Sequence, residues 1–276
     1  YSYAAQGIVE DVLFSQAFLS GPRMAANIVY AKGGFGTKYR PSDDALKKLI
    51  AGDKVKKYST KFYECMKRLN EKKEPSFVYS NFVEAGGTKD FILVLKSHGY
   101  SEYKHSLKPK KGKFYGVFRS GEEEKNKTLV ADFNRYENRH GKEIQIILGS
   151  PAMKEGISLK NTRYVHLLDP YWNNSRTEQI IGRAIRFCSH VSLKSQNRHV
   201  QVFHYISRIN GKRKTVDQHI MNMSNEKASV IHEFEQLLYK AAVDCNLFHK
   251  PNGLHITDCT SIRRDMLNPN VIEDPM

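Results

Sequence analysis

Two short apolar runs constrain the fold of this chain more than any other feature. They read IQIIL at 144–148 and YVHLL at 164–168. Runs of this length, rich in β-branched and large apolar residues, are typical of strands that are buried on both faces of a parallel sheet. A helical pattern over 176–187 and a further strand pattern over 200–206 follow them. This alternation predicts an α/β fold with a mostly parallel sheet and helices on both faces.

The same alternation precedes the two runs. Apolar residues at 62, 65, 66 and 69 predict a helix that begins near Ser59, and strand patterns cover 77–79 and 114–118. Between these strands, a helix is expected over 89–98, with Gly99 as its C-terminal cap. Residues 57–210 are therefore predicted to form one α/β domain.

The two flanks of this domain show different patterns. Residues 1–56 lack strong periodicity, and we interpret them as a peripheral N-terminal arm. Residues 211–276 turn helical and end in a tail that contains two prolines. Apolar residues recur there every three or four positions between Val230 and Cys245, and we interpret this stripe as a packing face rather than as a groove for a partner.

The charge of the chain favours a polyanionic partner. Lysine and arginine number 44 against 29 acidic residues, which gives a formal net charge of +15. Lys111 and Lys113 belong to a lysine-rich stretch that is a candidate for nucleic-acid contact, although such stretches are more often solvated surface. No apolar run approaches twenty residues, so no membrane partner is expected. The first residue is Tyr1 rather than methionine, and we interpret the chain as a piece of a longer protein.

Motifs that would bind and cleave a nucleotide are missing from the sequence. The glycine-rich segment from Gly33 to Lys38 continues with Tyr39, so it lacks the serine or threonine of a phosphate-binding GxxxxGK[ST] loop. No pair of acidic residues suited to magnesium follows a predicted strand, and no metal site is predicted. We therefore expect that this chain alone does not hydrolyse a nucleotide.

Residues suited to phosphate chemistry gather between 149 and 186. A loop with polar residues and glycines, 149–159, follows the first apolar run, at a position where open α/β sheets bind ligands. On the helix expected over 176–187, Gln179, Arg183 and Arg186 are four and three residues apart and share one face. Two guanidinium groups on one face suit a phosphate, since each is permanently charged and offers a planar fork of donors. The alternative is a solvated charged stripe.

These segments resemble the conserved motifs of superfamily 2 helicases and translocases. The pattern from Gln179 to Arg186, QxxGRxxR, is similar to motif VI, and residues 150–159 are similar to motif V. The DPxWN segment at 169–173 resembles the stretch before motif VI in Swi/Snf-type translocases, and 77–82 resembles motif IV. In their residues, these segments most resemble helicase-like transcription proteins of large cytoplasmic DNA viruses. These proteins are of the early transcription factor helicase and nucleoside triphosphate phosphohydrolase I types.

The resemblance implies a second RecA-like lobe. Residues 1–56 would then connect to a first lobe that supplies the Walker lysine and the magnesium-binding acids, with ATP and Mg²⁺ as cofactors. Arg186 would be the arginine finger, Arg183 a second phosphate contact, and Gln179 would orient water or phosphate. Gly156, Glu155 and Gly182 would border the nucleotide. Glu155 replaces an arginine found in DEAD-box proteins.

The resemblance also implies partners and a location. Ser80, Asn81 and Ser150 would contact a nucleic-acid backbone, with DNA favoured over RNA. The first lobe of the same protein, viral RNA polymerase or another transcription factor subunit would be protein partners, in the host cytoplasm (viral factory) and the virion. The alternative hypothesis is a non-catalytic, basic RecA-like module that docks onto nucleic acid or transcription partners.

Overall fold

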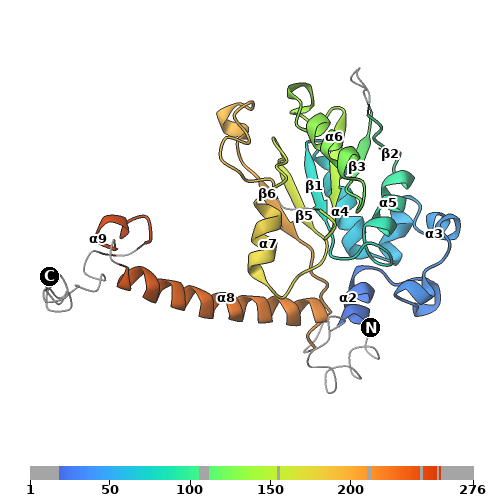
Figure 1. Ribbon diagram of the computed structural model, residues 1–276. Coiled ribbons are helices and arrows are strands. Elements are labelled where there is room, and N and C mark those ends of the chain that lie inside the picture. Colours follow the sequence, from blue (N-terminus) through green and yellow to red (C-terminus); the bar gives the residue numbers. More distant parts are fainter. Residues whose placement is uncertain are drawn as a thin grey trace, which may run out of the picture. The chain divides into compact units, whose positions relative to one another are not determined.

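The computed structural model describes residues 19–105, 112–153, 156–209, 213–242, 245–253 and 255 (Figure 1). Within these residues, six strands form one sheet in the order β2-β3-β4-β1-β5-β6, and every neighbouring pair is parallel. The strands are β1 (Ser76–Tyr79), β2 (Ser101–Glu102), β3 (Phe114–Val117), β4 (Ile144–Gly149), β5 (Tyr164–Leu167) and β6 (Gln201–His204). This arrangement confirms the predicted RecA-like α/β fold class.

Helices cover both faces of the sheet. Val78 of β1 packs in a buried cluster with residues of α4 (Thr60–Glu71) and α5 (Thr88–Ser97). Its neighbours Phe77 and Tyr79 pack in a second cluster, with residues of α6 (Glu123–Phe133) and α7 (Asn174–Ile181). Adjacent residues of a strand point to opposite faces, so one strand contributes to both layers. Figure 1 shows α4 and α5 on one side of the sheet and α7 on the other.

The register of the central strands determines where functional residues can meet. Tyr79, the last residue of β1, pairs with Gly149 of β4 and with Leu167 of β5. Ser80, Ser150 and Leu168 follow these three positions, so the chain leaves all three strands at the same edge of the sheet. Ligands of open α/β sheets bind at this carboxyl edge.

Two predicted helix boundaries are confirmed. One helix, α4, begins after Ser59, and another, α5, ends before Gly99. The hydroxyl of Ser59 accepts a hydrogen bond from the Phe62 amide at 3.0 Å and so caps α4. Gly99 has a φ of 82°, a left-handed conformation that costs glycine little and that commonly ends a helix.

The described part of residues 1–56 is not the predicted peripheral arm, because several of its side chains belong to the hydrophobic core. It contains α2 (Ser20–Asn27), α3 (Asp43–Leu49) and short 3-10 helices at Ala31–Gly33, Thr37–Tyr39 and Gly52–Lys57. Its side chains share the buried cluster of α4 and α5: Ile28, Tyr30, Leu46, Ile50 and Val55. These elements are too short for a periodicity that the sequence could reveal.

The helix predicted over 176–187 is too long at its C-terminal end. α7 ends at Ile181, and the following amides of Arg183 and Ala184 bond three residues back, as in a tightened last turn. The carbonyl of Arg183 accepts a hydrogen bond from the Leu159 amide at 2.8 Å, so it is used by the loop after β4 instead of by a continuing helix. Ile185, which lies within the predicted helix, is exposed.

The C-terminal region is helical, as predicted. It contains α8 (Val216–Ala241) and α9 (Cys245–Phe248), and a boundary between two compact units lies within α8, between Met223 and Ser224. The first turns of α8 belong to the sheet-containing unit, where Val216 and Ile220 are buried. Within the second unit, the predicted packing stripe is exposed at Val230, Ile231, Phe234 and Leu238.

In the described part of the chain, no helix combines the length and the apolar character that a membrane crossing requires.

Candidate functional site

A pocket of about 410 Å³ lies where β1 and β4 end. It brings together three residues that the sequence singled out: Ser150 from the loop after β4, Gln179 from α7 and Arg183 from the turn after α7. The other residues that line it are Tyr79, Pro151, Met153, Asn173, Ser175, Arg176 and Ile180. Its position at the carboxyl edge of the sheet is that of a ligand site in an α/β fold.

The two arginines of the predicted phosphate motif both reach the loop after β4. Arg183 Nη2 donates to the Met153 carbonyl, and Arg186 Nη1 donates to the Gly156 carbonyl, each at 3.3 Å. Arg186 is exposed and lies beyond the end of α7. The pair is therefore organised by the loop rather than by a shared helical face, which corrects the predicted arrangement.

The loop after β4 is held by a side chain from the end of α6. Asn134 Nδ2 donates to the Ser158 carbonyl at 2.8 Å, and Asn134 Oδ1 accepts from the Lys160 amide at 2.7 Å. Gly156 has a φ of 82° and is exposed, a backbone conformation that an L side chain rarely adopts. Asn134 therefore anchors the described segment 156–160, which contains the Gly156 carbonyl to which Arg186 donates.

A buried carboxylate, Asp169, lies beside the pocket and organises the ends of β1 and β5. It accepts hydrogen bonds from Ser80 Oγ at 2.7 Å and from Asn81 Nδ2 at 2.7 Å. Arg23 of α2 lies 3.6 Å from it and also donates to the Pro170 carbonyl. The Arg23 guanidinium stacks over the rings of Phe82 and Trp172, at 4.9 and 4.8 Å.

Burial and neighbouring charges shift the pKa values of Arg23 and Tyr79 in opposite directions. Burial lowers the pKa of Arg23, and the Asp169 carboxylate opposes that shift. Burial raises the pKa of Tyr79, whereas its hydrogen bond with Arg176 lowers it. Because the pKa of Tyr79 is raised, its hydroxyl is protonated at neutral pH.

The residues expected to contact nucleic acid do not form one surface. Ser80 is fully buried and bonded to Asp169, and Asn81 is half-buried on the same carboxylate. Ser150 lines the pocket. Lys113 is exposed, with its ammonium group 5.3 Å from the centre of the Tyr100 ring. Lys111 lies outside the described residues.

The residues expected around the nucleotide are divided between two places. Gly156 lines a neighbouring pocket of about 500 Å³, together with Ser158 and Asn134, rather than the pocket of Gln179 and Arg183. Gly182 caps the end of α7, where an added Cβ would lie 3.1 Å from the Glu178 carbonyl. Glu155 lies outside the described residues.

The composition of the pocket fits a phosphate group. Its described lining contains two guanidinium groups, two side-chain amides and hydroxyl groups but no carboxylate, so it suits an anion and not a divalent cation. Over the described part of the chain, no group of three or more histidine, cysteine, aspartate or glutamate residues could hold a metal ion. ATP phosphates therefore fit these residues, whereas Mg²⁺ would need ligands from elsewhere.

Sequence analysis missed Arg176, Tyr79 and Arg23. Arg176 precedes Gln179 by three residues and Arg183 by seven, a helical spacing that could have placed it on the same face. No local pattern marks Arg23, because its partners are about 60 to 150 residues away in the sequence.

Comparison with known proteins agrees with the geometry at the carboxyl edge. Residues 60–188 match the family described as the helicase conserved C-terminal domain. This segment is thus similar to the C-terminal domain of helicases. It includes β1, β4, β5 and α7, and therefore every element that lines the pocket.

Similar proteins come from large DNA viruses. A protein of Acanthamoeba polyphaga mimivirus, named as an ATP-dependent RNA helicase, is 36% identical over 241 residues, which are 86% of this chain and 41% of that protein. The termination factor NPH-I homolog of African swine fever virus is 30% identical over 264 residues, which cover 77% of this chain and 37% of that protein. The chain thus spans about two fifths of the length of these relatives.

Among solved structures, the helicase domain is similar to the C-terminal part of the Fun30 ATPase domain. The sequence identity is 15%, the TM-score is 0.46, and the match covers 67% of this chain and 55% of the other.

Proposed function

We propose that this chain is the second RecA-like lobe of a nucleic-acid-dependent ATPase of superfamily 2 that acts in viral transcription. One observation carries the proposal: Arg183 and Arg186 both donate to the loop after β4, so two permanent positive charges are positioned at the carboxyl edge of the sheet. A transferring phosphoryl group needs positive charge of this kind in its transition state.

The two arginines have different roles in this proposal. Arg186 is exposed, so it can reach a nucleotide bound to a first lobe and act as the arginine finger. Arg183 is half-buried in the pocket with Gln179, where it holds a phosphate group. ATP would supply the phosphoryl group, and the Walker lysine and the ligands of Mg²⁺ would come from the first lobe, because this chain carries neither motif.

The nucleic acid would be bound by basic residues of the carboxyl edge. The net charge of +15 supports a polyanionic track. One relative is named as an RNA helicase and another as a termination factor, so both DNA and RNA belong in the test. Viral RNA polymerase or another transcription factor subunit would be the protein partner, in the host cytoplasm (viral factory) and the virion.

The deciding experiment measures ATP hydrolysis by the full-length protein without nucleic acid, with duplex DNA and with RNA. Its variants are Arg186→Ala and, as a control, Arg139→Ala, which removes an arginine that stacks on Tyr136 at 3.9 Å and lies outside both pockets. We expect stimulated turnover in the parent and the control, and a loss in Arg186→Ala.

Turnover that does not change in Arg186→Ala would contradict the catalytic proposal. If the parent binds nucleic acid but hydrolyses no ATP, the lobe is instead the basic docking module of the alternative hypothesis.

A further inference from the structure

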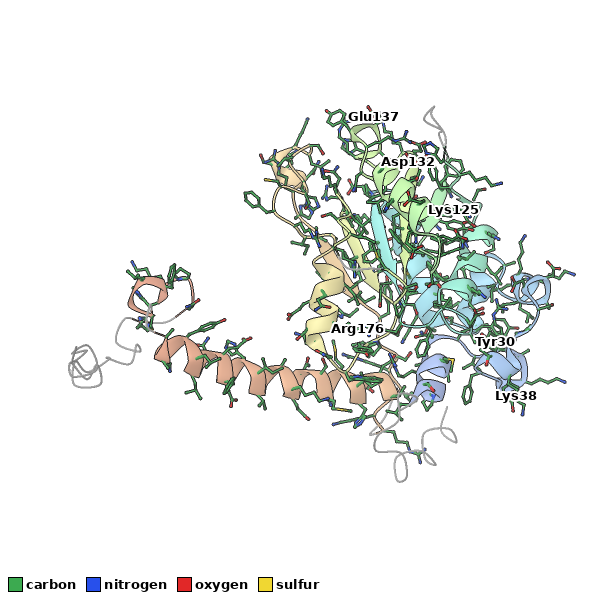
Figure 2. The ribbon with its side chains drawn as sticks, in the orientation of Figure 1. Tyr30, Lys38, Lys125, Asp132, Glu137 and Arg176 are labelled. Carbon is green, nitrogen blue, oxygen red and sulfur yellow. The ribbon has the colours of Figure 1, made fainter. Side chains whose placement is uncertain are left out.

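Arg176 is a second guanidinium group in the pocket of Gln179 and Arg183. It belongs to the first turn of α7, as Figure 2 shows, and it is half-buried. Arg176, Gln179 and Arg183 are separated by three and four residues, and all three line the pocket. The C-terminal end of the motif, Arg186, lies outside it.

Two tyrosines hold the Arg176 side chain. Its Nη1 donates to Tyr171 Oη at 3.3 Å, and the centre of its guanidinium lies 4.7 Å from the centre of the Tyr171 ring. Tyr79, at the end of β1, also lines the pocket, and its hydroxyl helps to raise the pKa of Arg176. Stacking and hydrogen bonds of this kind orient a guanidinium fork without neutralising its charge.

Arg176 makes no ion pair within the described part of the chain. Two other buried or half-buried arginines do: Arg23 is paired with Asp169, and Arg40 with Asp90 at 2.7 Å. The described lining of the pocket likewise contains no aspartate or glutamate to oppose Arg176. A partly desolvated cation without an acidic partner favours the binding of an anion.

A second pocket of the domain has a different composition, because acidic side chains line it. The pocket of about 540 Å³ between β3 and α6 has arginine and lysine side chains, but four carboxylates line it too: Glu102, Glu122, Glu124 and Asp132. One of its cations, Arg119, is paired, with Nη1 at 2.6 Å from Glu102. The pocket of Arg176 differs because its described lining contains two arginines and no carboxylate.

We propose that Arg176 and Arg183 together bind one phosphate group in this pocket, with the Ser150 hydroxyl and the Gln179 amide as further hydrogen-bond partners. The inference deepens the proposed function and relies on it for the role of Arg183. Ser150 is 4% exposed and accepts one hydrogen bond, from the Ala152 amide, so its hydroxyl hydrogen can be donated to the phosphate. The phosphate belongs either to a nucleotide or to a nucleic-acid backbone.

The test measures binding of inorganic pyrophosphate to the 276-residue chain by isothermal titration calorimetry at low ionic strength. The variants are Arg176→Gln, Arg183→Gln and the control Arg139→Ala. Glutamine at 176 removes the charge and keeps a polar side chain. We expect each of the first two variants to weaken binding by about tenfold or more, and the control to equal the parent.

Two further titrations distinguish the sources of the phosphate. If the site takes a nucleotide phosphate, Arg176→Gln weakens binding of a non-hydrolysable ATP analogue and leaves duplex DNA and RNA binding unchanged. If it takes a backbone phosphate, the variant weakens DNA or RNA binding and lowers its salt dependence by about one phosphate contact. Either result supports the proposal.

The proposal is overturned if Arg176→Gln binds all three ligands like the parent, or if the parent does not bind pyrophosphate. Thermal unfolding of each variant shows whether Arg176→Gln folds, and Arg176→Lys replaces it if it does not. Lysine keeps the charge but lacks the fork, so it should bind pyrophosphate with intermediate affinity. Failure here leaves the Arg186 hydrolysis test intact, so the two proposals fail separately.

Discussion

Ser80 and Asp169 lie 89 residues apart in the sequence, yet Ser80 Oγ donates to Asp169 Oδ1 at 2.7 Å in the interior. The bond joins the segments that leave β1 and β5, and Asn81 and Arg23 bind the same carboxylate. Asp169 is buried, with 4% of its surface exposed. It therefore fixes the edge of the sheet at which the pocket opens.

Replacing Asp169 with asparagine should destabilise the fold strongly. The change keeps the shape but leaves the Arg23 cation buried without its counter-charge, and removal of one partner of a buried pair costs about 3 to 5 kcal/mol. Urea unfolding followed by circular dichroism measures the difference in the free energy of unfolding.

The matched control for Asp169→Asn is Glu84→Gln. Glu84 pairs with Lys89 at 2.6 Å, but both side chains are about half exposed, so the loss should stay below about 1 kcal/mol. Equal losses in the two variants would show that the Asp169 network contributes no more than a surface ion pair.

The buried pair of Lys61 and Asp217 should behave as a coupled unit. Lys61 Nζ lies 2.6 Å from Asp217 Oδ2, and both side chains are almost fully buried, which joins α4 to the first turn of α8. Lys61→Met alone leaves the Asp217 carboxylate buried without a counter-charge and should lower the free energy of unfolding by about 3 kcal/mol or more. The double variant Lys61→Met with Asp217→Leu should cost less than the sum of the single variants. A double-mutant cycle of urea unfolding measures this coupling, and simple additivity would contradict it.

Because α7 ends at Ile181, alanine substitutions of two nearby isoleucines should differ in their effect on the free energy of unfolding. Ile180 is 5% exposed and packs in the buried cluster with α6, whereas Ile185 is 51% exposed. Ile180→Ala should lower the free energy of unfolding by about 2 to 5 kcal/mol, and Ile185→Ala should lower it by less than about 1 kcal/mol. Similar costs at both positions would show that the helix continues to Phe187 and packs Ile185 on the sheet.

His166 should make the fold less stable in mild acid. The side chain is buried on β5, where Nδ1 lies 2.8 Å from Tyr205 Oη, and burial followed by the nearby Arg68 charge lowers its pKa from 6.5 to about 3. Between these two values the unfolded chain binds a proton that the folded chain excludes. Stability should therefore fall as the pH drops below 6.5, by up to about 1.4 kcal/mol per pH unit.

The measurement is urea unfolding of the parent and of His166→Gln between pH 7.5 and 4.5. Glutamine retains a hydrogen-bond partner for Tyr205 and does not titrate. The difference between the two proteins should change with pH only below about 6.5. A constant difference across the range would show that His166 titrates alike in both states.

The sheet was predictable because its strands are short, apolar and bounded by polar residues. Runs such as 144–148 and 164–168 are buried on both faces, and this pattern is visible in a single sequence. Ser150 was predicted as a nucleic-acid contact, and Gln179 and Arg183 as phosphate contacts. The pocket contains all three.

The remaining features depend on contacts between distant segments. The carbonyl of Arg183 accepts from Leu159, which ends the helical pattern earlier than its spacing suggested. The buried residues of 19–56 belong to elements of three to eight residues, which carry little periodicity. Ser80 resembles a surface contact in sequence, but Asp169, far along the chain, holds it in the interior.

The most direct test of the central claim is to compare turnover with nucleotide affinity in Arg186→Ala of the full-length protein. An arginine finger acts on the transition state, so its loss should lower kcat by about a thousandfold or more. The Kd for ATP should change much less, because the ground state needs Arg186 less. A kcat that stays within a few fold of the parent, or an equal loss in ATP affinity, would contradict the account.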